Sequence, residues 1–169
     1  MWNKIKENPN LKTSEIIKKL RKQFSVYVYD EENVDKNFPA PKKATIRTFE
    51  PNIEADKNLK NLSADDLKEK GIDCVTLRER LIMELQYFKE TGKHLDIENI
   101  TLCAGSRDSD GSVPCVDWRS FYGELYVGGD SPSYWFEVLR SRAVVSPSTS
   151  KLESLPEILE INGVKYTRK

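Results

Sequence analysis

The sequence predicts an α+β fold, with most helices in the first half of the chain and most strands in the second. The longest apolar pattern before residue 92 repeats with the period of a helix. From Asp96 onward the period changes to two, which is typical of strands. The length of 169 residues suits one domain with its own hydrophobic core.

One helix and two strands are expected before residue 62. An apolar face formed by Ile16, Ile17 and Leu20 predicts a helix over 14–24, which Thr13 can cap. Alternation predicts short strands over 25–29 and 44–49. The polar segments between them are expected to be irregular, over 30–43 and 50–61.

Two further helices have ends that the sequence marks. The segment Ser63–Lys70 begins S-A-D-D, an N-cap with an acid three residues on, and Gly71 suits a left-handed C-terminal position. Thr76 begins T-L-R-E, a capping box, and opens a helix over 77–91 that ends at a glycine. Its apolar stripe predicts a core helix without chemistry, formed by Leu77, Leu81, Ile82, Leu85 and Phe88.

The second half is expected to form a sheet. Alternation predicts strands over 97–103, 113–118, 124–128 and 139–146, with a polar loop at 104–112. The tail 148–169 is expected to form a helical turn followed by a strand, with a bend at Gly163.

Alternation also assigns side chains to faces. Val116 and Trp118 are expected to point one way, and Cys115, Asp117 and Arg119 the other. In the next strand, Leu125 and Val127 are expected to point inward, and Tyr126 and Gly128 outward.

The charge balance argues against a nucleic-acid-binding protein, although it says nothing against a local basic patch. The 27 basic residues cancel the 27 acidic ones, whereas a nucleic-acid-binding protein has a basic excess or stripe. No apolar run is long enough to span a bilayer, and the N-terminus lacks the apolar segment of a signal peptide. The protein is therefore expected in the cytoplasm as made, or associated with a virion or surface by assembly.

Cysteine and histidine usage predicts no metal site. Cys74, Cys103 and Cys115 form no C-x-x-C pair, so reduced thiols are expected, with one of Cys103 and Cys115 buried and the other partly exposed. His94 is the single histidine. It lies near Asp96, but its position after a helix suits a residue favoured by the helix dipole better than a catalytic triad.

The loop at 108–112 only partly matches a calcium site. Asp108, Asp110 and Ser112 resemble the start of a calcium loop, but the glycine is at the fourth place instead of the sixth and no Glu follows at the twelfth. The chain contains no G-x-G-x-x-G and no Walker sequence. No cofactor, metal or catalytic residue is therefore predicted.

The stretch from Ser112 to Ser146 is unusual in composition. It is dense in Tyr, Trp, Phe, Ser, Gly and Arg, and no Lys occurs between Lys93 and Lys151. Such a composition is typical of a binding face, because rigid aromatics supply contact area and small polar residues supply adaptable hydrogen bonds. The alternative is a set of core strands that happen to be aromatic. The unusual residues occur in bursts separated by plain scaffold, which suggests a fixed frame that displays a variable surface.

The frame resembles the variable proteins of diversity-generating retroelements. The resemblance lies in 77–96, in 99–114, and in the pattern V-x-W … LYV … P … LRSRAVVS that ends at Ser146. In that family an error-prone reverse transcriptase rewrites a variable region by mutating template adenines, chiefly in Asn codons. The absence of Asn between Asn99 and Asn162 fits this process.

The resemblance implies a C-type-lectin-like fold in a single domain, 1–169. Its N-terminal elaboration would cover about 1–72, its lectin-like core about 73–169, and its variable region about 112–146.

The resemblance also implies a set of diversified surface positions. Trp135 and Glu137 cannot arise from an Asn codon by adenine changes alone. Trp135 is kept as a contact residue on physical grounds, and Glu137 is left out. The resulting ligand-binding set comprises Cys115, Asp117, Arg119, Ser120, Phe121, Tyr122, Gly128, Asp130, Ser131, Ser133, Tyr134, Trp135, Phe136 and Val138.

The implied function is binding of an unknown protein or cell-surface ligand, without catalysis. Arg140 and Arg142 would be fixed by hydrogen bonds to backbone carbonyls or carboxylates. The core of the frame would consist of Trp118, Leu125, Val127 and Leu139. Two alternatives remain: an enzyme on the same fold that resembles formylglycine-generating enzymes, and a virion or structural assembly protein that uses the aromatic face as an interface.

Overall fold

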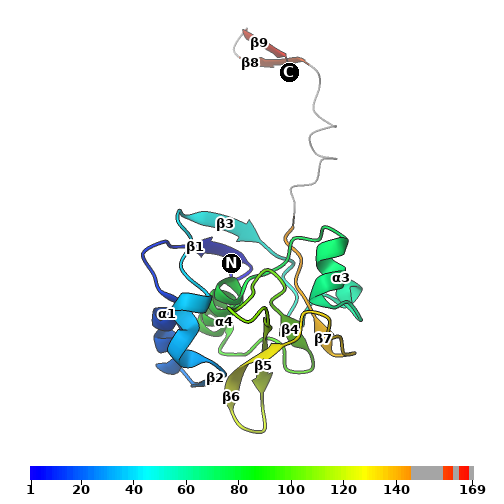
Figure 1. The fold of residues 1–169 in the computed structure, drawn as a ribbon. Helices are drawn as coiled ribbons and strands as arrows, with labels where there is room; N and C mark the ends of the chain where they lie inside the picture. The colour runs from blue at the N-terminus through cyan, green and yellow to red at the C-terminus, as the bar shows by residue number, and fades with distance from the viewer. Residues whose placement is uncertain (146–157, 162–163, 168–169) are drawn as a thin grey trace.

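A computed structural model describes residues 1–145, 158–161 and 164–167, and its fold is α+β as predicted (Figure 1). Its main sheet has five strands in the order β2-β6-β5-β4-β7. The β4–β5 and β5–β6 pairs are antiparallel, whereas β2–β6 and β4–β7 are parallel. The strands are β2 (Ser25–Val28), β4 (Ile100–Leu102), β5 (Val113–Arg119), β6 (Glu124–Asp130) and β7 (Leu139–Arg140).

The two capped helices form as the sequence predicts. Helix α3 spans Ala64–Glu69 and helix α4 spans Leu77–Thr91. The hydroxyl of Ser63 accepts from the Asp66 amide and that of Thr76 from the Glu79 amide, so both N-caps are confirmed. Gly71 and Gly92 both have positive φ, 66° and 68°, which suits the left-handed ends that only glycine adopts without strain.

The first helix differs from its prediction at both ends. Helix α1 spans Thr13–Arg21, so Thr13 is not the cap; Lys12 stands at the N-cap and its amide donates to Glu15. Thr13 is instead buried, donates to the Phe38 carbonyl and accepts from Arg78. The segment 30–43, expected to be irregular, contains a 3₁₀ turn (Glu31–Asn33) and the one-turn helix α2 (Val34–Asn37). A second 3₁₀ turn, Lys57–Leu59, lies in the other segment expected to be irregular.

A small antiparallel pair lies beside the main sheet. Strand β3 (Thr45–Thr48) pairs with β1 (Lys4–Glu7), which the sequence did not predict. The sequence of β1, KIKE, has one apolar residue, so it carries almost no alternating hydrophobic signal.

The predicted strand 139–146 is shorter than expected, since β7 contains only Leu139 and Arg140. Beyond it Ala143 and Val144 form isolated bridges to Cys74 and Phe49. Where the chain leaves the sheet, Ser141 donates its hydroxyl to the Leu102 carbonyl and the Arg142 side chain is buried.

In the tail, β8 (Ile158–Ile161) pairs antiparallel with β9 (Val164–Thr167). Residue 158 onward thus contributes two strands where one was expected. Gly163 and residues 148–157 lie outside the described residues. No helix in the described ranges has the length and apolar character needed to cross a membrane.

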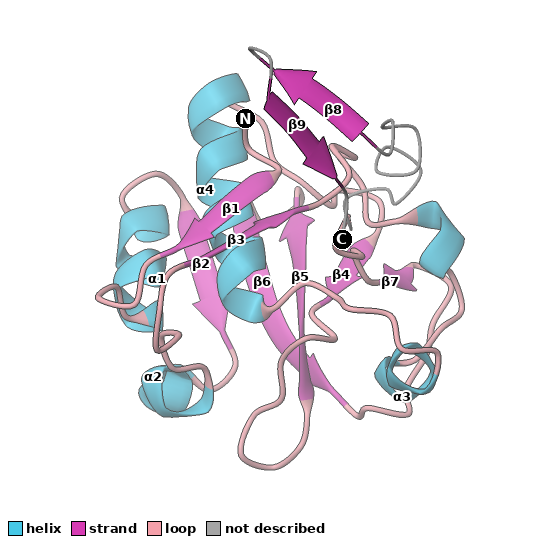
Figure 2. Cartoon of the chain, turned by 90° about the horizontal axis from the view of Figure 1, so that it is seen from above, coloured by secondary structure: helices cyan, strands magenta, loops and turns pink. Residues whose placement is uncertain are grey.

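Two hydrophobic clusters hold the sheet. The larger one joins α1 and α4 to the face of β5 and β6 that carries Val116, Leu125 and Val127. The smaller cluster joins α3 to the opposite face through Leu102, Cys115 and Leu139. Figure 2 shows α1 and α4 at the β2–β6 end of the sheet and α3 near β7. Helix α3 therefore covers the opposite face at its β7 end.

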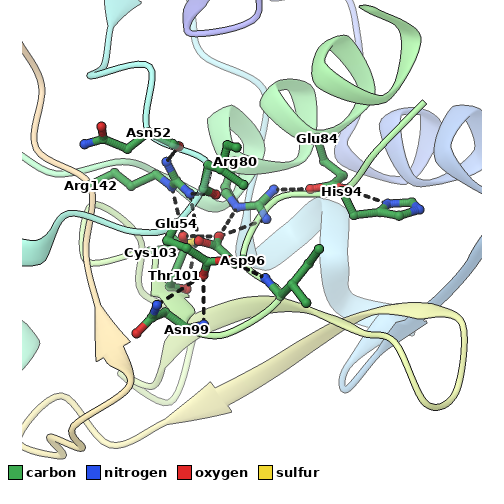
Figure 3. A network of polar contacts seen from close by, with 12 residues as sticks. Asn52, Glu54, Arg80, Glu84, His94, Asp96, Asn99, Thr101, Cys103 and Arg142 are labelled. Atoms are coloured by element: carbon green, nitrogen blue, oxygen red, sulfur yellow. Dashed lines mark hydrogen bonds and ion pairs between the residues drawn. The ribbon is translucent and has the colours of Figure 1, made fainter. Parts of the chain in front are cut away.

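A buried ionic network links α4 to the loop before β4 and to the segment after β7 (Figure 3). Arg80, Glu84, Asp96 and Arg142 are all fully buried. Arg80 contacts Glu84 Oε2 at 2.8 Å and Asp96 Oδ2 at 2.9 Å. Arg142 donates to Asp96 Oδ1 at 2.7 Å, and also to the carbonyls of residues 52 and 53. The expectation that hydrogen bonds fix Arg142 is confirmed.

Arg140 differs from that expectation. Its Nε is buried without a hydrogen-bond partner among the described residues. Arg140 belongs to β7 at the sheet edge, whereas Arg142 lies past the strand end and reaches the interior.

Candidate ligand-binding surface

The β5–β6 hairpin displays much of the predicted binding set. Its register places Cys115 opposite Gly128, Asp117 opposite Tyr126, and Arg119 opposite Glu124. Because directly opposed residues in a sheet share a face, these side chains point to the side away from α1 and α4. The turn between the strands, residues 120–123, lies at the end of the molecule remote from β1 and β3 (Figure 1).

This face contains a hollow of about 310 Å³. Residues from β4, β5, β6, β7 and the loop before β7 line the hollow, which opens to solvent. The predicted positions that line it are Cys115, Asp117, Arg119, Gly128, Asp130, Tyr134 and Phe136.

Charged and aromatic groups contact one another in the hollow. The guanidinium carbon of Arg119 lies 3.3 Å from the ring centroid of Tyr126, and its Nε lies 3.7 Å from Asp117 Oδ2. Asp117 Oδ1 is buried and has no hydrogen-bond partner among the described residues. Burial raises the pKa of Asp117, while the neighbouring Arg119 guanidinium acts in the opposite direction.

Exposed rings lie both in the lining of the hollow and around it. Phe121 is 92% exposed at the hairpin turn, where it makes an edge contact with Tyr122 at 5.1 Å between ring centroids. Tyr134, Trp135 and Phe136 are also exposed. The aromatic stretch therefore divides as its bursts suggested: these rings face solvent, whereas Trp118 is half-buried and packs against the larger cluster.

The remaining predicted positions are polar or small. Ser120, Ser131 and Ser133 are exposed, and the hydroxyls of Ser131 and Ser133 lie 3.1 Å apart. Asp130 and Val138 are half-buried.

Two positions assigned to the displayed surface are buried. Cys115 packs into the smaller cluster, because α3 covers that end of the sheet face. Cys103 is buried as well, so the expectation of one partly exposed thiol is wrong. Gly128 is buried beside Tyr126: a Cβ there would lie 2.6 Å from the Tyr126 ring and 3.3 Å from Cys115 Sγ. A larger residue at position 128 therefore requires the Tyr126 ring to move.

Two tyrosines of this surface were not in the predicted set. Tyr126 lines the hollow and stacks on Tyr27, with ring centroids 5.1 Å apart and planes at 5°. The outward phase of Tyr126 was visible in the alternation, but the residue was assigned to the scaffold. Tyr27 comes from β2, whose parallel pairing with β6 leaves no signal in the sequence.

The other motifs are held by internal bonds. His94 Nδ1 lies 2.9 Å from Glu84 Oε1, and its ring stacks on Trp118 at 3.3 Å between centroids. The carboxylate of Asp96 contacts Arg80 and Arg142 rather than His94. In the loop at 108–112, Asp108 accepts from the amides of Asp110 and Ser112 and from the hydroxyl of Tyr29. Those hydrogen bonds tie the loop to itself and to Tyr29. Within the described ranges, no group of three or more His, Cys, Asp or Glu side chains could hold a metal ion.

Comparison with known proteins adds no relative. No protein-family model, curated protein sequence or solved structure matches the chain.

Proposed function

We propose that this protein is a binding protein with a diversified surface, similar to the variable proteins of diversity-generating retroelements. The observation that carries the proposal is the convergence of positions chosen from the sequence. Cys115, Asp117 and Arg119 of β5 meet Gly128 and Asp130 of β6 around one hollow. Exposed rings of the same set line it at Tyr134 and Phe136 and extend beyond it at Phe121, Tyr122 and Trp135.

The surface has the physical character of a paratope. Exposed Phe, Tyr and Trp side chains offer large contact areas with few rotatable bonds, and they dominate binding energy in many interfaces. Most such rings in a monomer would be buried in its core. Here Phe121, Trp135 and Phe136 lie at the surface, where a protein ligand or a cell-surface ligand could cover them.

The frame beneath this surface suits repeated replacement of the displayed residues. Leu125 and Val127 are fully buried, while Phe121 and Tyr122 make no part of either hydrophobic cluster. Substitutions at exposed positions usually change the free energy of unfolding by about 0.5 kcal/mol or less, and core truncations cost several times more. Replacement of the exposed members of the set can therefore change the ligand without losing the fold.

The proposal includes a C-type-lectin-like fold for the domain. The mixed five-stranded sheet, the flanking helices and the long irregular connections support this finer assignment. Binding without catalysis is likewise proposed. Burial raises the pKa of the Cys103 and Cys115 thiols, and thiolate is the reactive form that an enzyme resembling formylglycine-generating enzymes would need.

Comparison of independent copies of the gene tests the proposal. Amino-acid differences are expected mainly at the thirteen proposed positions other than Trp135, with few at Leu125, Val127 or Arg142. A near-copy of the region, rich in Asn codons and close to a reverse-transcriptase gene, is also expected. Differences spread evenly over frame and surface, with no such repeat nearby, would contradict the proposal.

A structural assembly role is the second candidate, because exposed rings at 121–122 and 134–136 could equally bury themselves against another subunit. Sedimentation velocity over a range of concentrations separates the two. A monomer at all concentrations favours ligand binding, whereas an oligomer that Phe121→Ser and Trp135→Ser dissociate favours assembly.

A further inference from the structure

The hollow on the β5–β6 face has a lining that selects one chemical class of ligand. Asp117 and Asp130 contribute two carboxylates, and Arg119 is the one basic residue of the lining within the described part of the chain. The lining therefore carries more negative than positive charge when both acids are ionised. Its aromatic members are Tyr126, Tyr134 and Phe136.

Arg119 already forms one cation contact with an aromatic ring and a carboxylate of this lining. Its guanidinium lies over the Tyr126 ring at 3.3 Å, with Asp117 3.7 Å away. A cation between a ring face and a carboxylate is stabilised by both, which is the basis of many binding sites for basic groups. The hollow thus contains an internal example of the recognition chemistry that it can offer to a ligand.

Asp130 is the acid without such a partner. No ion pair joins it to a basic residue of the described chain, and the thiol of Cys115 lies close enough to interact with its carboxylate. A thiol is a weak donor that does not compensate a carboxylate charge. Tyr134 and Phe136, half-exposed in the same lining, leave their rings open to a bound side chain.

We propose that the hollow binds a basic side chain, lysine or arginine, of a protein ligand. Asp130 pairs with the ammonium or guanidinium group, and Tyr134 and Phe136 pack against the aliphatic stem. The volume of about 310 Å³ lies at the lower end of ligand pockets, so it suits one side chain rather than a large cofactor. An anionic ligand would face two carboxylates for one guanidinium. The inference rests on the proposed function and deepens it by naming the ligand chemistry.

An NMR titration of the ¹⁵N-labelled full chain tests the inference. The probes are the Nα-acetyl methylamides of lysine, arginine, norleucine and glutamate. The lysine or arginine probe is expected to shift amides of residues 115–119, 126–130 and 134–136 in a saturable way. The apolar norleucine probe, which has the stem without the charge, should bind about three- to tenfold more weakly.

Two variants assign the charge. Asp130→Asn should weaken binding of the basic probe about three- to tenfold while keeping the shape of the side chain. Glu137→Gln is the matched control, because Glu137 is exposed, pairs with Lys60 and does not line the hollow. It should leave the affinity unchanged. Comparison of the lysine and arginine probes separates the two basic groups.

Several outcomes would overturn the inference. They are equal binding of norleucine or glutamate, unchanged lysine and arginine binding in Asp130→Asn, shifts outside the hollow, and the absence of saturable shifts with either basic probe. The proposed function fails separately. If gene copies vary as expected but basic probes do not bind, the inference alone fails. If basic probes bind but the gene copies do not vary, the inference about the ligand class stands and the proposal of a diversified surface fails.

Discussion

Replacing Arg142 by Met should destabilise the protein strongly, because Arg142 holds four oxygen atoms in the interior. It donates to Asp96 Oδ1 at 2.7 Å, to the carbonyls of residues 52 and 53 at 2.6 and 2.9 Å, and to Thr101 Oγ1 at 3.0 Å. Removing one partner of a buried ion pair costs about 3–5 kcal/mol. Since Arg80 still contacts Asp96 in the variant, we expect a loss near the lower end, about 3 kcal/mol.

Urea unfolding followed by tryptophan fluorescence measures this loss, and Arg140→Met is the matched control. Arg140 lies two residues earlier, is half-buried and has a buried Nε without a partner among the described residues. Its replacement should change the free energy of unfolding by less than about 1 kcal/mol. In thermal unfolding the difference corresponds to roughly 2–4 °C per kcal/mol for a chain of this size. Equal losses in the two variants, or a loss below about 1 kcal/mol for Arg142→Met, would refute the assigned role of the network.

Three further predictions concern the frame and the surface. Phe121→Ser should change the free energy of urea unfolding by about 0.5 kcal/mol or less, whereas Leu125→Ala should cost about 2–5 kcal/mol; similar costs would contradict the division into displayed and core residues. Gly105→Ala should lower the free energy of unfolding by about 1–3 kcal/mol in the same assay, because its Cβ would overlap the Cys74 carbonyl oxygen. This loss should exceed the loss in Gly128→Ala, where the Tyr126 ring can move away from the new Cβ. Burial raises the folded-state pKa of Asp117, so between the unfolded value of about 3.9 and that raised value the folded state binds more protons and stability falls as pH rises. Asp117→Asn should make the free energy of unfolding less dependent on pH in that window. An unchanged dependence would contradict a raised pKa for Asp117 in the folded state.

The two capped helices, α3 and α4, were predictable from local chemistry. Ser63 and Thr76 carry caps whose bonds form within four residues, so their geometry depends little on the rest of the fold. The inward phase of Leu125 and Val127 was equally predictable, because one apolar cluster covers that face of the sheet. The local sequence pattern was therefore sufficient to predict helix caps and side-chain phase where these depend on residues close in sequence.

Long-range contacts account for the errors. Cys115 has the outward phase of a displayed residue, but α3 and β7 reach that part of the face from distant positions. The parallel β2–β6 pair brings Tyr27 to the surface and leaves no periodic signal. Thr13 looked like a cap, yet it is buried against Phe38 and Arg78. In each case tertiary packing determined the outcome that the local pattern could not.

The buried network supports the strand that carries part of the proposed variable surface. Asp96 has a left-handed φ of 53°, an uncommon conformation for a residue other than glycine, and its carboxylate contacts both Arg80 and Arg142. Its backbone carbonyl accepts from the Trp118 amide at 2.9 Å. The network therefore fixes β5 from the side opposite the hollow, next to Asp117 and Arg119. Because no residue of the network belongs to the proposed diversified set, substitutions on the surface leave this support intact.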